Sequence, residues 1–329
     1  MLNIDVLTHL QSHFCDRNIR KLHKVQSLWS GYGEIARYNS PRLNSSFIVK
    51  HISPPIEQAH PKGWNTQTSH QRKLQSYVVE ANFYHNYAPL CDEYCAVPKL
   101  LAEFSENQQQ ILVLQDLDQA GFSVRRNKAG MADVMLGIKW LAYFHARFLQ
   151  RDSHGLWPVG TYWYLATRQE ELKVMEQGKL KDAATRLDTA LNSACFQTLV
   201  HGDAKLANFC FPDEAPFNRL AAVDFQYVGK GVGVKDLVYF LSACLRQDDL
   251  FKHEQDLLNE YFSQLKYALV HYQVELDFTH MQQGWRRLYP LAWADFYRFL
   301  LGWSPGHYKI NCYMQKQTDI ALASLSIEF

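Results

Sequence analysis

Residues 200–208 read Val-His-Gly-Asp-Ala-Lys-Leu-Ala-Asn, and residues 223–225 read Val-Asp-Phe. Each stretch ends a short apolar run of the kind that forms strands, so both polar segments are expected at strand ends. Asp203 and Asn208 lie five positions apart, and Asp224 follows at the end of the second run. This spacing predicts three oxygen-bearing side chains around one point. Phosphoryl transfer from a nucleotide requires such a set, with one carboxylate as the base and an amide and a second carboxylate on Mg²⁺.

The same residue types also have an ordinary structural explanation. Asp and Asn often occur in turns, where their side chains bond the local backbone, and the pattern arises from composition in roughly a few per cent of chains of this length. The strand-like runs at 198–200 and 221–223 favour the functional interpretation. We therefore assign Asp203 as a general base and Asn208 and Asp224 as metal ligands.

These segments resemble the aminoglycoside phosphotransferase and choline kinase superfamily, and within it the ecdysteroid kinase-like branch. The residues that carry the resemblance are Phe47-Ile48-Val49-Lys50, Glu80 with Phe83-Tyr84, Leu114-Gln115-Asp116-Leu117, Leu199-Val200-His201-Gly202-Asp203, Asn208, Asp224-Phe225-Gln226 and Asp236-Leu237-Val238-Tyr239-Phe240-Leu241. The resemblance implies a two-lobed protein-kinase-like fold of the α+β class. It also implies ATP- and Mg²⁺-dependent transfer of the γ-phosphate to a hydroxyl group.

The order of the expected elements agrees with two lobes. Strands are expected at 25–29, 34–38, 47–52, 98–104 and 110–114, and helices at 3–14, 72–88, 132–150, 161–177, 234–245, 250–274 and in parts of 284–325. The proline-containing segment 51–69 is expected as a loop. We divide the chain into a nucleotide-binding lobe, residues 1–116, built on a small antiparallel sheet, and a larger, mainly helical catalytic and acceptor-binding lobe, residues 117–329.

Lys50 is the main nucleotide contact expected in the small lobe. It shares one strand face with Ile48 and Ile52, and a lysine among aliphatic side chains requires a partner, for which Glu80 on the following helix is available. The kinase-like arrangement implies that Lys50 holds the α- and β-phosphates, that Glu80 holds Lys50, and that Ile48 packs against adenine. The alternative is a solvated edge-strand lysine.

Two further segments are expected around the nucleotide. Ser30-Gly31-Tyr32-Gly33 precedes the second strand, where Gly31 and Gly33 would let backbone N–H groups approach phosphate oxygens. A plain hairpin turn is the alternative. Gln115 and Leu117 lie where the lobes join, and the resemblance implies that the backbone there bonds the adenine edge.

Lys205 and His201 complete the expected catalytic loop. Lys205 lies two residues after Asp203, where protein kinases place a lysine against the transferred phosphoryl group, and we assign it to the γ-phosphate; a solvated loop lysine is the alternative. His201 is expected to support the loop by hydrogen bonds rather than to transfer protons. Asp236 is expected to cap a helix or to hold the catalytic loop from below.

The acceptor is expected to be a small molecule. Only eleven residues separate Asp224 from Asp236, too few for the activation segment and docking platform of a protein kinase. Between residues 283 and 315 the one acid is Asp295, which favours a neutral or largely apolar hydroxylated acceptor over a cationic one. Aromatic residues crowd this region and are expected to form core or to line an apolar acceptor pocket. They are Trp285, Tyr289, Trp293, Phe296, Tyr297, Trp303 and Tyr308. A choline-like cation in an aromatic cage is the alternative.

The composition is that of an ordinary globular protein. The chain has 329 residues, 47% of them hydrophobic, and a formal net charge of +1, which indicates no nucleic-acid partner. The most aromatic stretch, 288–303, is interrupted by Asp295 and Arg298, so we expect no membrane span. Seven scattered cysteines favour reduced thiols and a cytoplasmic location. The oligomeric state is left open.

The sequence is compatible with functions from three different classes. The first is a kinase of a small hydroxylated compound, with choline, ethanolamine or an aminoglycoside as alternative acceptors. The second is a nucleotide-binding pseudokinase scaffold, which would bind ATP without turnover. The third is a metal hydrolase built on His201, Asp203 and Asp224, which lacks additional histidine ligands at a suitable spacing. The complete set of kinase-like polar residues favours the first.

Overall fold

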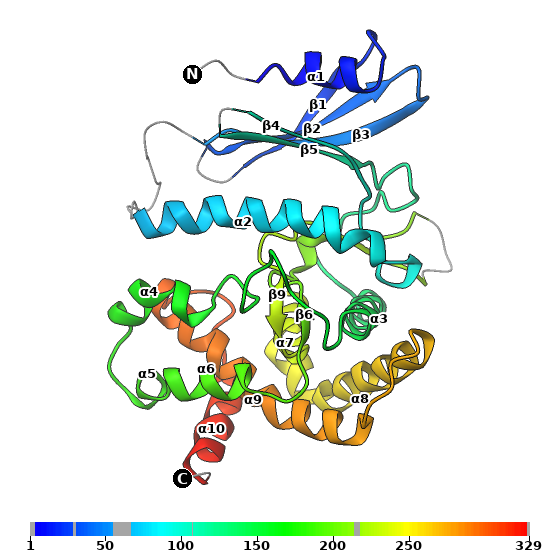
Figure 1. Cartoon of the computed structure of the whole chain (residues 1–329). Coiled ribbons are helices and arrows are strands. Elements are labelled where there is room, and N and C mark those ends of the chain that lie inside the picture. Colours follow the sequence, from blue (N-terminus) through cyan, green and yellow to red (C-terminus); the bar gives the residue numbers. More distant parts are fainter. Residues whose placement is uncertain (1–3, 29–30, 55–66, 107, 214–217, 328–329) are drawn as a thin grey trace.

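The computed structural model of the chain describes residues 4–28, 31–54, 67–106, 108–213 and 218–327. A small lobe with a five-stranded antiparallel sheet in the order β1-β2-β3-β5-β4 lies above a larger, mainly helical lobe (Figure 1). The strands are β1 (Arg20–Ser27), β2 (Gly33–Ser40), β3 (Ser45–Ile52), β4 (Leu100–Glu106) and β5 (Gln109–Gln115). The expected α+β class, with its small antiparallel sheet and helical second lobe, is confirmed.

Two helices cover the two faces of the sheet (Figure 1). Leu10 of α1 (Val6–His13) packs with Phe47 and Val49 of β3 in one apolar cluster. Helix α2 (Gln67–Asn86) lies on the opposite face. It begins at Gln67, so its first three residues fall within the segment 51–69 that was expected as a loop. Because side chains alternate along a strand, β3 directs Phe47 and Val49 toward α1 and Lys50 toward α2.

Strand β1 begins at Arg20, five residues before the expected start at Val25, and Trp29 lies outside the described residues. Every side chain of β1, an edge strand of the sheet, is exposed. The apolar alternation on which the prediction relied is therefore absent from its first half. Charged side chains such as Lys21 and Lys24 are common on edge strands, where they discourage pairing with other chains.

The large lobe is built from eight described helices and two short strand pairs. The helices are α3 (Met131–Arg147), α4 (Gln169–Val174), α5 (Lys179–Asp182), α6 (Ala184–Asn192), α7 (Val234–Cys244), α8 (Gln247–His271), α9 (Phe278–Trp303) and α10 (Cys312–Ile327). Strand β6 (Thr198–Val200) pairs with β9 (Gly229–Gly231), and β7 (Phe209–Cys210) pairs with β8 (Ala221–Ala222). Single 3₁₀ turns occur at Ala88–Leu90, Glu93–Cys95, Leu165–Thr167 and Leu206–Asn208.

The prediction of a single helix at 161–177 is wrong. A 3₁₀ turn at Leu165–Thr167 is followed by the short α4, with Arg168 between them in a non-helical conformation. The guanidinium of Arg168 donates to the backbone carbonyl of Tyr162 at 2.7 Å and to the carboxylate of Glu171 at 2.9 Å. These bonds draw the chain into a compact turn that hydrophobic periodicity alone does not reveal.

An aromatic stack joins the two lobes. The ring of Phe225 lies parallel to that of Phe83 on α2, with the centroids 3.8 Å apart, and it also contacts Phe144 of α3 and His201. All four side chains are fully buried, and burial of one such ring contributes roughly 2 kcal/mol. The stack therefore fixes Asp224, the neighbour of Phe225, relative to α2.

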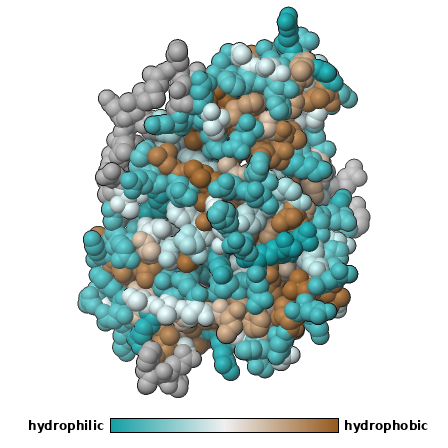
Figure 2. Space-filling view, in the orientation of Figure 1, coloured by the Kyte–Doolittle hydropathy of each residue, from teal (hydrophilic) through white to brown (hydrophobic). Residues whose placement is uncertain are grey.

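Most of the C-terminal aromatic residues belong to the core of the large lobe. Trp285, Tyr289, Trp293 and Phe296 are buried, whereas Tyr308 is 81% exposed. On the face shown in Figure 2, hydrophobic residues form small patches among hydrophilic ones. Within the described ranges, no helix has the length and apolar character needed to cross a bilayer. All seven cysteines are free.

Candidate active site

Asp236, in the first turn of α7, holds the catalytic loop from below. Its Oδ2 accepts the backbone N–H of His201 at 2.6 Å, and its Oδ1 accepts that of Gly202 at 2.9 Å. Nε2 of His145 on α3 lies 3.1 Å from the same carboxylate, and both side chains are fully buried. The supporting role expected of Asp236 is confirmed. His145 was not predicted, because a histidine on an apolar helix face carries no signal of its partner.

Gly202 and His201 shape the loop before Asp203. Gly202 has φ +79°, and a Cβ there would overlap the backbone carbonyl of Tyr227, so the position requires glycine. With Nε2 of His201 donating to the carbonyl oxygen of Val223 (3.1 Å), Nδ1 accepts the backbone N–H of Asp203 (3.3 Å). Both ring nitrogens are thus used within the fold, which favours the loop-supporting role of His201 over proton transfer or metal ligation.

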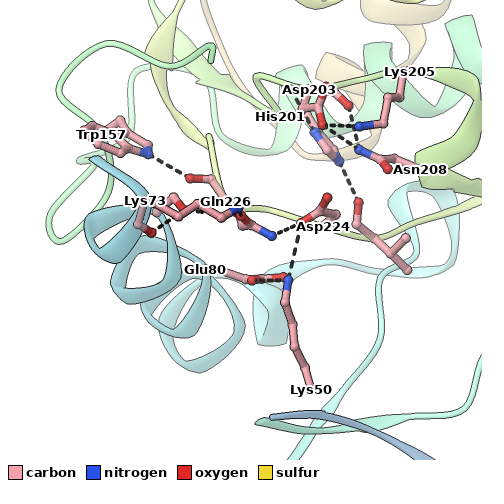
Figure 3. Close-up of polar contacts among 12 residues, drawn as sticks. Lys50, Lys73, Glu80, Trp157, His201, Asp203, Lys205, Asn208, Asp224 and Gln226 are labelled. Carbon is pink, nitrogen blue, oxygen red and sulfur yellow. Dashed lines mark hydrogen bonds and ion pairs between the residues drawn. The ribbon is translucent and has the colours of Figure 1, made fainter. Parts of the chain in front are cut away.

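Two donors of the loop converge on one oxygen of Asp203 (Figure 3). Lys205 Nζ and Asn208 Nδ2 donate to Oδ2 at 2.7 and 3.1 Å. The phenol of Tyr239 on α7 also hydrogen-bonds the Asp203 carboxylate, which contributes to raising the pKa of Tyr239. Among the described residues, no hydrogen bond reaches the amide oxygen of Asn208. Burial by itself lowers the pKa of Lys205, but the carboxylates of Asp203 and Asp224 outweigh it and raise the pKa above its usual value. Lys205 is therefore a fixed positive charge beside Asp203.

Asp224 is an ionised carboxylate in an unusual backbone conformation. Its φ is +70°, a left-handed value that costs a residue other than glycine roughly 1–2 kcal/mol. Burial by itself raises the pKa of Asp224, but the charges of Lys50, Lys205 and Lys73 outweigh it and lower the pKa to about 2. About a third of the side chain, 33%, is exposed. Asp224 therefore combines a fixed negative charge with access from outside.

Lys50 and Glu80 form a buried ion pair. Nζ of Lys50 lies 2.6 Å from Oε2 of Glu80 and 3.4 Å from Oδ1 of Asp224, and only 4% of the lysine and 2% of the glutamate side chain are exposed. Burial by itself lowers the pKa of Lys50, but these two carboxylates outweigh it and raise the pKa above its usual value. The partner expected for Lys50 is thus present, and the lysine links α2 to the Asp224 segment.

A second link between α2 and this segment, through Gln226, was not predicted. Gln226 donates through Nε2 to Oδ1 of Asp224 at 2.6 Å, and its Oε1 accepts Nζ of Lys73 at 2.8 Å and Oγ of Ser76 at 3.2 Å (Figure 3). The available signal was the position of Lys73, which lies two helical turns before Glu80 and therefore on the same face. Lys73 brings a third lysine charge to Asp224.

Of the two predicted glycines, Gly31 lies in the connection between β1 and β2, and Gly33 is the first residue of β2. Ser30 falls outside the described residues. Gly33 has φ +130°, and a Cβ there would overlap the carbonyl oxygen of His51 on β3. Close strand pairing therefore accounts for Gly33 without a ligand. Gly31 has φ +75° and open space around it. No hydrogen bond among the described residues joins either glycine to the polar cluster.

The remaining predicted nucleotide contacts lie along the sheet. Ile48 precedes Lys50 by two positions on the same face of β3 and pairs with Leu114 of β5. Gln115 and Leu117 line a groove of about 1280 Å³ beside the edge strand β4. The described residues that line this groove do not include the lysines and carboxylates of the cluster.

The fold is that of the kinase-like phosphotransferases. The chain superposes on choline kinase from Cryptosporidium parvum with a TM-score of 0.51 and 10% identity, covering 98% of this chain and 95% of that chain. Two other similar structures are the microcompartment-associated aminopropanol kinase (TM-score 0.48, 13% identity, coverage 97% and 95%) and aminoglycoside phosphotransferase APH(3'')-Id from Streptomyces rimosus with ADP and streptomycin (0.43, 16%, 89% and 100%). At this identity the choline kinase match establishes the fold, and the expected kinase-like architecture is confirmed.

The sequence comparison is more specific. Residues 162–274 match the ecdysteroid kinase-like family, which confirms the resemblance predicted from the motifs. The matched segment contains the catalytic loop, Asp224 and the supporting Asp236. No curated protein sequence matches the chain.

Proposed function

We propose that this protein is a phosphotransferase that moves the γ-phosphate of ATP, with Mg²⁺, to a hydroxyl group of a small molecule. The observation that carries the proposal is the carboxylate of Asp203. Its Oδ2 accepts hydrogen bonds from Lys205 and Asn208, which fix its orientation, and it stands beside the ionised Asp224. The match of residues 162–274 to the ecdysteroid kinase-like family supports the same conclusion.

Asp203 acts as the general base in this proposal. Oδ1 accepts the proton of the acceptor hydroxyl, while the two donors on Oδ2 fix the orientation of the carboxylate. In a loose phosphoryl-transfer transition state, positioning contributes more than a shifted pKa does. Lys205 keeps its charge within reach of the oxygens that become more negative during transfer.

The residues present fit a magnesium nucleotide. The amide oxygen of Asn208, free of hydrogen bonds from the described residues, and the ionised carboxylate of Asp224 are hard oxygen donors of the kind that Mg²⁺ prefers. Lys50, Lys73 and Lys205 all act on Asp224, so positive charge from three elements surrounds the place where phosphates would bind. When bound, the magnesium nucleotide supplies the phosphoryl group and its leaving group.

The connection after Asp224 supports a small-molecule acceptor. Strand β9 and helix α7 follow within ten residues of it, and they form parts of the fold rather than a peptide-docking platform. We further propose that residues 1–116 form the nucleotide-binding lobe and residues 117–329 the catalytic and acceptor-binding lobe, since β5 ends at Gln115. The free cysteines favour a cytoplasmic location.

The variant Asp203→Asn tests the proposal. The amide keeps the shape and an oxygen for the two donors but cannot accept the proton, so turnover should fall by on the order of 10² to 10⁴. Turnover is measured as ADP release over a panel of alcohols, sterols, choline and aminoglycosides. Binding of a non-hydrolysable ATP analogue, measured by calorimetry, should remain nearly unchanged. Asp213→Asn, a change in an exposed surface carboxylate, is the matched control. Wild-type turnover in Asp203→Asn would contradict the base assignment.

A further inference from the structure

Lys309 is a buried lysine beside the proposed base that none of the roles above uses. It lies between α9 and α10, and only 7% of it is exposed. Its Nζ lies 4.2 Å from the ring centroid of Tyr239 on α7 and 5.6 Å from that of Phe296 on α9. These distances are those of cation–π contacts. The ammonium group of Lys309 therefore occupies a cage formed by these two rings, which we call the Tyr239–Phe296 cage.

The ammonium group of Lys309 has N–H groups that form no hydrogen bond with the described residues. It carries three N–H groups and gives one hydrogen bond among the described residues, to Oγ of Ser242 at 3.3 Å. Lys309 forms no ion pair with any of the described residues. The one acid of this region, Asp295, instead pairs with Arg298 at 2.8 Å and Lys235 at 3.9 Å. A buried cation with unused donors requires an explanation, and a ligand oxygen provides one.

Tyr239 connects Lys309 to the catalytic loop. The ring of Tyr162 meets that of Tyr239 edge to face at 5.4 Å, and the backbone N–H of Tyr162 donates to the carbonyl of Gly202 at 3.1 Å. The charge of Asp203 reaches both rings, since after burial it is the largest cause that raises the pKa of Tyr162 and of Tyr239. The Tyr239–Phe296 cage and Lys309 thus lie within electrostatic reach of the Asp203 carboxylate.

We propose that Lys309 determines the acceptor class. Its own ammonium fills the aromatic cage that a quaternary ammonium acceptor would need, and its remaining N–H groups are offered to an oxygen of the acceptor. The acceptor is then a hydroxylated compound with no cationic group near the reacting hydroxyl. This inference rests on the proposed function, because it concerns the acceptor of the same base. Two positive charges placed close together away from water repel strongly, so the Lys309 ammonium would discriminate against a cationic acceptor in favour of a neutral one.

Two alcohols of the same shape test the inference. Choline and 3,3-dimethyl-1-butanol differ only in a positively charged nitrogen in place of a carbon atom. Their binding is measured by saturation-transfer NMR titration at pH 7 without nucleotide. The wild type should prefer the neutral alcohol. Lys309→Met, which nearly conserves volume, should bind choline more tightly by on the order of tenfold or more, with little change for the neutral alcohol. Lys309→Arg, which keeps the charge, should retain the wild-type preference.

The wild-type protein offers a second measurement that depends on no variant. Burial lowers the pKa of Lys309 to about 8, so its charge is present at pH 7 and mostly lost at pH 9.5. Choline affinity should rise over this range, and the affinity for the neutral alcohol should stay constant. The titratable groups that face Lys309 are Asp203 and Lys205 from the catalytic loop, Tyr239 and Cys244 from α7, and His307 of its own loop. The pKa of Lys205 is raised, that of Tyr239 lies well above its ordinary value and that of Cys244 is about 12, so these groups keep their charge state.

Three results would overturn the inference. They are a wild type that prefers choline, a folded Lys309→Met protein that gains no choline affinity, and a choline affinity that stays constant between pH 7 and 9.5. Failure of the proposed function is a separate result. It would appear as a wild type that binds no magnesium-loaded ATP analogue and releases no ADP with any acceptor, and the choline titration requires neither activity.

Discussion

Replacing Gln226 with leucine should weaken the magnesium-dependent binding of nucleotide. Gln226 donates to Asp224 at 2.6 Å and is itself held by Lys73 and Ser76 of α2. Leucine has a similar volume and leaves the backbone carbonyl of residue 226 free to accept Nε1 of Trp157, as it does in the wild type at 2.8 Å. The substitution therefore removes the side-chain bridge while keeping the local packing.

The expected magnitude follows from the contacts that remain. A hydrogen bond to a charged group contributes about 1.5–3 kcal/mol. The lower end applies to Asp224, because the carboxylate is 33% exposed and keeps the Lys50 contact. A loss of about 1.4 kcal/mol corresponds to a factor of ten. The Mg²⁺ concentration that gives half-maximal binding of a non-hydrolysable ATP analogue should therefore rise about tenfold in Gln226→Leu.

The assay is a calorimetric titration of the analogue over a range of MgCl₂ concentrations. Ser76→Ala is the matched control, because it removes the 3.2 Å bond to the far end of the bridge and leaves the bond to Asp224 in place. Its magnesium dependence should match that of the wild type. If Gln226→Leu also matched the wild type, or if both variants changed equally, the bridge would have no part in positioning Asp224.

The other predictions concern the same cluster. Asp224→Ala should impair magnesium-dependent nucleotide binding more than Asn208→Ala does, because the carboxylate carries the charge that a hard cation requires; equally small effects in a magnesium titration would exclude both as ligands. Lys50→Met should lower nucleotide affinity or turnover without unfolding the protein, since Glu80 can take up a proton when its partner is lost. The double variant with Glu80→Gln separates phosphate binding from the loss of the ion pair. A Lys50→Met protein with wild-type affinity and rate would show that the lysine is structural.

The sequence determined the catalytic loop because its interactions are local. Asp203 and Asn208 lie in one turn between two short strands, so a five-residue spacing is enough to bring them together. The strand alternation that placed Lys50 opposite Phe47 and Val49 is likewise a local property. The Lys50–Glu80 pair followed from a lysine that required a partner and a helix that offered one. These patterns, with the order of strands and helices, were sufficient to predict the kinase-like fold.

Only the tertiary structure decided which distant side chains meet. Lys73 and Gln226 are 153 positions apart, and the bridge between them depends on how α2 docks against the Asp224 segment. Lys309 reaches the rings of Tyr239 and Phe296 because three segments of the large lobe converge there. Helical spacing places Lys73 on the same face as Glu80, but no pattern in the sequence indicates Gln226 as its partner or the two rings as those of Lys309, because these partners are set by packing. The local sequence pattern was therefore enough to propose the chemistry of the reaction, whereas only the tertiary structure decided which charged side chains surround Asp203 and Asp224.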